Sequence, residues 1–167
     1  AGETTLRERL AERYGVDPEN LLVTAGATHA NFLAAAAAVT DEETAVRAAD
    51  ETEGEGGASA SSDDSLPAPR VLVEKPGYEP LLATPEAVGA TVDRFFRPPD
   101  EGYPLHPERV EAALADDTAL VTVTNRHNPS GRSTDRETLA EAARVVGDAG
   151  AKLLVDEVYA PFRAEPG

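Results

Sequence analysis

Segment 151–162 constrains the fold of this chain more than any other, because polar side chains directly follow a short apolar run. The run Leu153–Val155 lacks the alternation of a half-exposed strand, which predicts a strand buried on both faces of a parallel sheet. Asp156 ends the run and Tyr159 follows on the same segment. Ligands of open α/β sheets bind beyond the carboxyl ends of the strands. Asp156 alone reads as a cap of the next turn, so a functional interpretation depends on a second polar segment, residues 125–131.

Strands and helices alternate along the rest of the sequence. Short β-rich runs predict strands at residues 21–24, 71–73, 91–96 and 119–124. Helical spacing or helix-forming composition predicts helices over residues 5–14, 31–39, 78–88, 107–114 and 134–149. This alternation predicts an α/β fold with a mostly parallel sheet and helices on both faces, in which strand 91–96 lies near the sheet edge.

Local signals mark the ends of two of these helices. Thr5 with Glu8, and Thr134 with Glu137, have the spacing of capping boxes. Gly15 suits the position just after the first helix, where left-handed backbone is common. The buried face of the last helix is expected to carry the apolar side chains of Leu139, Ala142, Ala143 and Val146.

A change of composition interrupts this alternation at about residues 41–69. This stretch is rich in Glu, Gly, Ser and Asp and has little to bury, which predicts an acidic, disordered insertion. Because the α/β alternation resumes immediately, we expect one domain over residues 1–167 with an insertion inside it.

The charge of the chain restricts its partners. It has 31 acidic and 15 basic residues, a net charge of −16, and the acids occur in every segment. An acidic interaction surface and adaptation to concentrated salt both explain such a charge, and the even spread favours the second because salt screens self-repulsion. No basic patch is present for nucleic acid. We therefore expect a halophilic protein that does not bind nucleic acid.

Other function classes lack the residues that they need. The chain has no cysteine, and His29 has no second metal-type residue at helical spacing, so we expect no metal site. No apolar run approaches the roughly 18 residues of a membrane span, and no signal peptide is recognisable. A cytoplasmic protein without membrane contact is the resulting expectation.

Small residues separate the predicted strand at 21–24 from the following helix. Gly26, Ala27 and Thr28 occupy this turn. The N–H groups at a helix start bind anions, and small side chains permit a phosphate to approach closely, with the Thr28 hydroxyl adding a hydrogen bond. Packing alone also selects small residues here, so this signal is weak by itself.

Four short motifs together resemble one enzyme family. His127-Asn128-Pro129-Ser130-Gly131 resembles the Asn-Pro-Thr/Ser-Gly signature of the class I/II aminotransferases, fold-type I enzymes that use pyridoxal 5′-phosphate. Asp156-Glu157-Val158-Tyr159 is similar to the Asp-x-x-Tyr motif of that family. Gly26-Ala27-Thr28 resembles its phosphate turn, and Pro76-Gly77-Tyr78 its Pro-x-aromatic segment. The motifs stand in family order, so the resemblance implies part of a fold-type I large domain.

The resemblance also implies roles for six cofactor-binding residues. Asp156 would pair with the pyridine nitrogen, and Asn128 and Tyr159 would hydrogen-bond the phenolate oxygen of the ring. Tyr78 would lie against one ring face. Ala27 and Thr28 would hold the phosphate. His127 is expected to support Asn128, whereas Glu74, Lys75 and Glu157 are expected to be surface or structural residues.

The Schiff-base lysine of the family has no counterpart in the sequence. The family binds its cofactor through a Schiff-base lysine beyond the Asp-x-x-Tyr motif, and neither of the two lysines, Lys75 and Lys152, matches that position. The C-terminal substrate-binding arginine and the small domain of the family are also not matched. We therefore expect a chain that is truncated before the lysine, with no catalytic residue of its own and inactive in isolation.

The implied function is that of the parent enzyme. The resemblance implies a homodimeric aminotransferase that moves an amino group between an amino acid and a 2-oxo acid. Another fold-type I enzyme, such as a carbon–sulfur lyase, would share every motif quoted above. A non-catalytic remnant that binds pyridoxal phosphate weakly or not at all is the third possibility.

Overall fold

The computed structural model describes residues 3–53 and 68–162 of the chain. Two compact units are present, residues 1–30 and residues 31–167. No helix in the described residues is long and apolar enough to cross a membrane. The described residues also contain no group of three or more His, Asp or Glu side chains that would suit a metal ion.

The first unit begins with helix α1, Thr4–Tyr14, followed by the short 3-10 helix η1, Pro18–Asn20. The capping box predicted from Thr5 is wrong, because Thr5 already lies inside the helix and Glu3 is the N-cap residue, without a side-chain cap. Gly15 ends α1 as predicted, with a φ of 66° and its N–H bonded to Ala11 O.

The strand predicted at residues 21–24 does not form. Its β-rich composition is insufficient because a strand needs a neighbour, and none of the four strands in the described sheet pairs with it. Arg7 instead bonds this region to α1 by donating from Nε to Leu21 O at 3.1 Å and from its guanidinium to Pro18 O. The next residues lead into helix α2, Ala27–Glu53.

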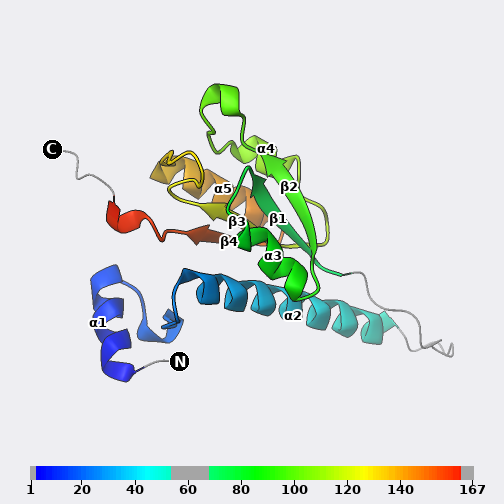
Figure 1. The fold of residues 1–167 in the computed structure, drawn as a ribbon. Coiled ribbons are helices and arrows are strands. Elements are labelled where there is room, and N and C mark those ends of the chain that lie inside the picture. The colour runs from blue at the N-terminus through cyan, green and yellow to red at the C-terminus, as the bar shows by residue number, and fades with distance from the viewer. Residues whose placement is uncertain (1–2, 54–67, 163–167) are drawn as a thin grey trace. The chain divides into compact units, whose positions relative to one another are not determined.

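The second unit contains a parallel sheet of the predicted kind. Its strands are β1 (Arg70–Lys75), β2 (Thr91–Phe96), β3 (Thr118–Thr124) and β4 (Lys152–Asp156), in the order β2-β1-β3-β4 (Figure 1). Every pairing is parallel, and β2 lies at the edge as expected. The connecting helices are α3 (Pro80–Ala87), α4 (Pro107–Glu111) and α5 (Arg136–Asp148), with short 3-10 turns η2 (Pro99–Glu101) and η3 (Ala160–Phe162).

Two hydrophobic clusters cover the two faces of this sheet. Val71 and Val73 of β1 pack with α2 and α3, whereas Leu72, between them, packs with α4 and α5. Neighbouring residues of β1 face opposite sides of the sheet because successive side chains of a strand alternate between its two faces. The prediction of helices on both faces is confirmed, and the carboxyl ends of all four strands open on the same edge of the sheet.

Helix α2 corrects the predicted boundaries of the acidic insertion. Residues 41–53 are helical rather than disordered, because the run Glu42–Ala49 consists mainly of good helix formers such as Ala, Glu and Arg. Residues 68 and 69 already lead into β1. The remainder of the predicted insertion, residues 54–67, lies outside the described residues.

The cap and buried face of α5 also differ from prediction. Asp135 is the N-cap residue in place of Thr134, and its carboxylate accepts from Thr138 N at 2.8 Å. Asp135 also caps more strongly than threonine would. Ala143 is exposed, while Val145 joins the buried face.

Strand β4 is less covered than its apolar run predicts. Its residues Leu153, Leu154 and Val155 are half-buried, whereas all seven residues of β3 are buried. The reason is position, since β4 ends the described sheet while β3 lies inside it. A run of three apolar residues does not by itself distinguish these two environments.

Candidate functional site

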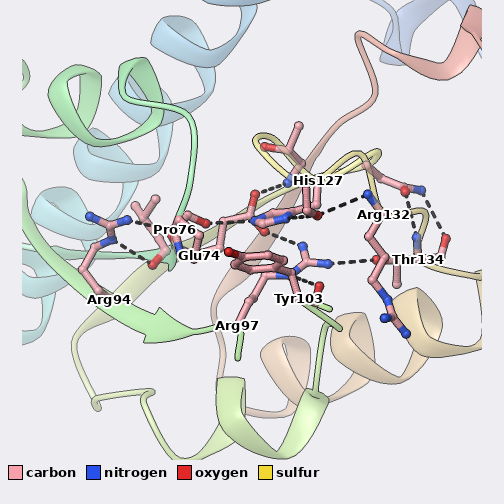
Figure 2. Close-up of polar contacts among 12 residues, drawn as sticks. Glu74, Pro76, Arg94, Arg97, Tyr103, His127, Arg132 and Thr134 are labelled. Atoms are coloured by element: carbon pink, nitrogen blue, oxygen red, sulfur yellow. Dashed lines mark hydrogen bonds and ion pairs between the residues drawn. The ribbon is translucent and has the colours of Figure 1, made fainter. Parts of the chain in front are cut away.

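Three loops at the carboxyl edge of the sheet are joined through one buried ion pair. Glu74, near the end of β1, and Arg97, just after β2, lie 2.7 Å apart from Oε2 to Nη1, and both are fully buried (Figure 2). The second carboxylate oxygen of Glu74 accepts from Thr124 N at 2.8 Å. Arg97 also donates from Nε to Tyr103 O at 3.0 Å. The pair therefore connects β1, β2 and β3 where the loops begin.

Burial sets the electrostatics of this pair. It raises the pKa of the Glu74 carboxyl, against the effect of the Arg97 guanidinium and the Thr124 N–H. It also lowers the pKa of Arg97, with Glu74 opposing. Each group thus depends on the other to remain charged away from water.

His127 fastens the loop after β3 to the loop after β1. Its Nε2 lies 2.9 Å from Pro76 O, which only accepts, so Nε2 carries the proton. Its Nδ1 lies 2.7 Å from Ser130 Oγ and accepts from that hydroxyl, which itself accepts from Arg132 N at 3.2 Å. Burial lowers the pKa of His127, and Arg97 adds to this effect, whereas the bond to Pro76 opposes it. Both hydrogen bonds are those of a neutral imidazole.

Asn125 closes the loop after β3, residues 125–134, hereafter the β3 loop. Its side chain accepts from Thr134 N at 3.1 Å and donates to Thr134 O at 3.4 Å, so it joins the two ends of the loop. Its backbone N–H donates to Asp156 O at 2.8 Å. These bonds fix the position of the β3 loop relative to the end of β4.

Asp156 is buried at the carboxyl end of β4. Its Oδ2 accepts from Asn31 Nδ2 at 2.8 Å, and its Oδ1 accepts from Val158 N at 3.0 Å. Only 5% of Asp156 is exposed. An ionised carboxylate has about four acceptor positions, so these two donors orient Asp156 and leave acceptor capacity for a further donor.

A pocket of about 240 Å³ lies between the β3 loop and the segment after β4. The structure brings Asn128 and Tyr159 together on its wall, which is formed by Arg126, His127, Asn128, Pro129, Gly131 and Tyr159. Asn128 and Tyr159 come from different loops and lie 31 positions apart in the sequence. A donor amide and a phenol at one pocket suit an oxygen-bearing ring.

The other predicted residues occupy separate places. Tyr78, in the loop between β1 and α3, is 37% exposed and is not part of the wall of this pocket. Ala27 and Thr28 lie in the first turn of α2, after Gly26 with a φ of 84°. The first N–H groups of a helix have no acceptor within the helix, so this turn retains the donors expected of an anion site.

Sequence reasoning missed Asn31 and the importance of the pair formed by Glu74 and Arg97. Asn31 shares one buried face of α2 with Ala35 and Ala38, so its polar side chain on an apolar stripe was an available signal. Glu74 directly continues the buried run of β1, which is a signal of a buried cationic partner. Lys75 and Glu157 are exposed, as expected of surface residues.

Comparison with known proteins assigns the chain to a family. The family model described as aminotransferase class I and II matches residues 64–166, and the chain belongs to this family. The aspartate/prephenate aminotransferase of Thermus thermophilus is 28% identical over 95% of this chain and 36% of its own length. Capreomycidine synthase of Streptomyces vinaceus is 33% identical over 53% of this chain and 23% of its own length.

Solved structures agree with this assignment. The aspartate aminotransferase of Thermus thermophilus with maleate superposes with a TM-score of 0.74 at 26% identity, over 95% of this chain and 36% of that protein. N-succinyldiaminopimelate aminotransferase of Mycobacterium tuberculosis gives a TM-score of 0.68 at 25% identity. The fold is that of part of an aminotransferase large domain, and the chain spans about a third or less of the length of the curated relatives quoted above.

Proposed function

We propose that the protein carrying this chain is a pyridoxal 5′-phosphate-dependent aminotransferase, which moves an amino group from an amino acid to a 2-oxo acid. The observation that carries the proposal is the oriented, buried carboxylate of Asp156 at the end of β4. Asn128 and Tyr159, lining one pocket after β3 and β4, add the donors that such a cofactor requires. The family membership of the chain supports the same function.

The donor set fits the cofactor group by group. A pyridinium nitrogen needs an acceptor, and Asp156 has acceptor capacity left after Asn31 and Val158. A phenolate oxygen needs donors, which the amide of Asn128 and the hydroxyl of Tyr159 supply. A phosphate needs N–H groups, and the turn of Ala27 and Thr28 begins a helix.

The residues of this chain bind and tune rather than react. When bound, pyridoxal phosphate supplies an electron-poor ring that accepts electrons from the substrate. Asp156 holds a proton on the ring nitrogen, and the buried position of its carboxylate strengthens that attraction. Asn128 and Tyr159 stabilise negative charge on the ring oxygen. Tyr78 would lie against one face of the ring, and the N–H groups of the Ala27–Thr28 turn would bind the phosphate.

The wider properties of the protein belong to the same proposal. We propose one partial large domain over residues 1–167, cytoplasmic, without nucleic-acid or membrane partners, within a homodimeric parent enzyme that contains the Schiff-base lysine. The net charge of −16, spread along the whole chain, supports a protein that works in concentrated salt.

A lyase is the second candidate, because two relatives carry such names. Cystathionine beta-lyase of Corynebacterium glutamicum is 25% identical over 58% of this chain, and S-alkyl-thiohydroximate lyase of Arabidopsis thaliana is 27% identical over 56%. Both reactions need the same ring support from Asp156, Asn128 and Tyr159, so this part of the site serves either function.

Following the amino nitrogen tests the proposal. The full-length protein is incubated with pyridoxal phosphate, a ¹⁵N-labelled amino acid and an unlabelled 2-oxo acid. An aminotransferase delivers ¹⁵N to the new amino acid, whereas a lyase releases it as ammonium. Absence of both products, together with no change in the absorption spectrum of the cofactor, would identify a non-catalytic remnant and reject the proposal.

A further inference from the structure

Arg126 carries the one buried side-chain nitrogen or oxygen at the pocket that has no hydrogen-bond partner among the described residues. It lies between Asn125 and His127, which are almost completely buried, and lines the pocket with Asn128 and Tyr159. Its Nε is buried and has no hydrogen-bond partner among the described residues. Such orphaned donors are rare in folded proteins, so each one calls for an explanation.

The other polar side chains at the ends of the β3 loop all have partners. Asn125 bonds to both backbone groups of Thr134, and His127 bonds to Pro76 and Ser130. Thr122 and Thr124 also have buried hydroxyls without a described partner, but neither forms part of the wall of this pocket. Arg126 therefore combines an unused donor with access to a pocket.

The partly or fully buried arginines of residues 68–162 show how unusual Arg126 is. Arg70 pairs with Asp93 and Asp117, Arg94 donates to two backbone carbonyls, and Arg97 pairs with Glu74. None of the ion pairs among the described residues includes Arg126. In a chain with about twice as many acids as bases, this guanidinium without an ion pair points to a partner outside the described residues.

The chemistry of the guanidinium narrows that partner to an oxyanion. Its planar fork of N–H groups matches a carboxylate or a phosphate with two parallel hydrogen bonds. The phosphate of the proposed cofactor is already assigned to the turn of Ala27 and Thr28. A carboxylate is therefore the remaining anion in the proposed reaction.

We propose that Arg126 binds a carboxylate of the amino-acid and 2-oxo-acid substrates and so contributes to substrate selection. This inference rests on the proposed function for the identity of the anion. Asn128 and Tyr159, on the same pocket wall, hold the cofactor ring, and Arg126 is thus a substrate-binding residue beside the ring site.

The experiment measures carboxylate binding without turnover. Succinate and propionate, which carry two carboxylates and one but no amino group, are titrated into the full-length protein loaded with pyridoxal phosphate, by calorimetry. In Arg126→Gln the dissociation constant of the probe that uses this site is expected to rise at least about tenfold, equivalent to about 1.4 kcal/mol. Arg126→Lys, which keeps the charge but loses the fork, should give a smaller rise. Arg136→Gln, an exposed arginine at the start of α5, is the charge-matched control and should change neither constant.

The pattern of results identifies the carboxylate. Weakening of succinate alone assigns Arg126 to a side-chain carboxylate, and weakening of both probes assigns it to the α-carboxylate, so either result supports the proposal. Equal affinities of Arg126→Gln and the unaltered protein for both probes would overturn it.

Two further outcomes distinguish a failure of this inference from a failure of the proposed function. If cofactor binding and ¹⁵N transfer occur but Arg126→Gln binds both probes normally, only the inference fails. If neither cofactor binding nor transfer occurs while Arg126→Gln still weakens succinate in the unloaded protein, the carboxylate site stands and the function fails. If the variants do not fold, the Nε–H resonance of Arg126 in the NMR spectrum of the unaltered protein is followed instead. A shift of this resonance when a probe is added supports the site. A resonance that stays unchanged with both probes rejects it.

Discussion

The two walls of the pocket are supported very differently. The β3 loop is held by Glu74, Arg97 and His127, all with 1% exposure or less, and it follows a strand in which every residue is buried. The segment after β4 has one buried anchor, Asp156, beyond which Val158 and Tyr159 are 48% and 39% exposed. Support on the first side comes from within the described residues. On the second side, Asp156 is held by Asn31 Nδ2, Val158 N and the backbone bond from Asn125, and Ala160 N donates to Glu157 O at 2.8 Å.

This difference separates stability from function. Residues under the β3 loop contribute to the free energy of unfolding, and through it to the position of Asn128. Val158 and Tyr159, which are 48% and 39% exposed, are expected to contribute less to folding, and their conformation is expected to matter mainly when a ligand is bound. Changes on the first side should therefore be visible without cofactor, and changes on the second side mainly with it.

The largest effect is expected from breaking the buried ion pair. Arg97→Met leaves the Glu74 carboxyl buried without the cation that keeps it charged, which should reduce the free energy of unfolding by about 3–5 kcal/mol. Urea denaturation monitored by circular dichroism measures this loss. Arg144→Met, at an exposed pair with Glu141, is the control and should have little effect.

A double substitution sharpens the same test. Glu74→Gln with Arg97→Met removes both charges but keeps an oxygen to accept from Thr124 N, so part of the lost stability should return. A double variant that is less stable than Arg97→Met would show that the pair does not act as a unit.

The next effect belongs to the β4 side and needs the full-length enzyme. Asp156→Ala removes the carboxylate that keeps the ring nitrogen protonated, so kcat should fall at least about a hundredfold, or about 2.7 kcal/mol in transition-state stabilisation. Cofactor affinity should fall less, because Asn128, Tyr78 and the phosphate turn remain. Steady-state kinetics and spectroscopic titration measure the two quantities.

Glu157→Ala is the matched control for this prediction. Glu157 is the exposed neighbour of Asp156, and its removal should leave kcat nearly unchanged. Near-normal turnover of Asp156→Ala, with loss of activity in Glu157→Ala, would contradict the assignment of Asp156 to the ring nitrogen.

The contrast between the two walls also explains what the sequence predicted. The four strands of the sheet are found at the predicted places because each has a local signal, a short apolar or β-rich run in β1, β3 and β4 and alternation in β2. Motifs predicted Asn128 and Tyr159 as cofactor-binding residues, a role that stays a prediction, and the structure brings both to one pocket. The strand expected at 21–24 failed because pairing is not encoded locally.

The contacts that support the site were harder to predict, because they join distant residues. Asn31 and Asp156 are 125 positions apart, and Glu74 and Arg97 are 23 apart. No local period relates such residues, and composition says only that a buried charge needs some partner. Likewise, equal runs of apolar residues did not reveal that β3 lies inside the described sheet while β4 ends it.

A smaller effect is expected from the titration of His127. Burial holds its pKa below the ordinary value, so between about pH 6.5 and that lowered pKa the unfolded chain binds a proton that the folded chain does not. The free energy of unfolding should therefore decrease as the pH is lowered through this window. This group contributes at most about 1.4 kcal/mol per pH unit to that decrease. His127→Gln does not titrate there, so its urea midpoint should depend less on pH. Parallel pH profiles of the two proteins would contradict this contribution.

The smallest effect on the free energy of unfolding is expected from a substitution at Tyr159. This substitution tests the expectation that the segment after β4 serves ligand binding rather than folding. The ring is 39% exposed, so Tyr159→Phe should leave the free energy of unfolding within about 0.5 kcal/mol of the original without cofactor. The lost hydroxyl is one of the two donors proposed for the ring oxygen, and one hydrogen bond contributes about 1 kcal/mol, which corresponds to a roughly fivefold weaker cofactor. Tyr14→Phe, at a more exposed tyrosine of α1, should change neither quantity. If Tyr159→Phe instead destabilised the cofactor-free protein and left cofactor affinity unchanged, the segment after β4 would be a folding element like the β3 loop, and the distinction between the two walls would be wrong.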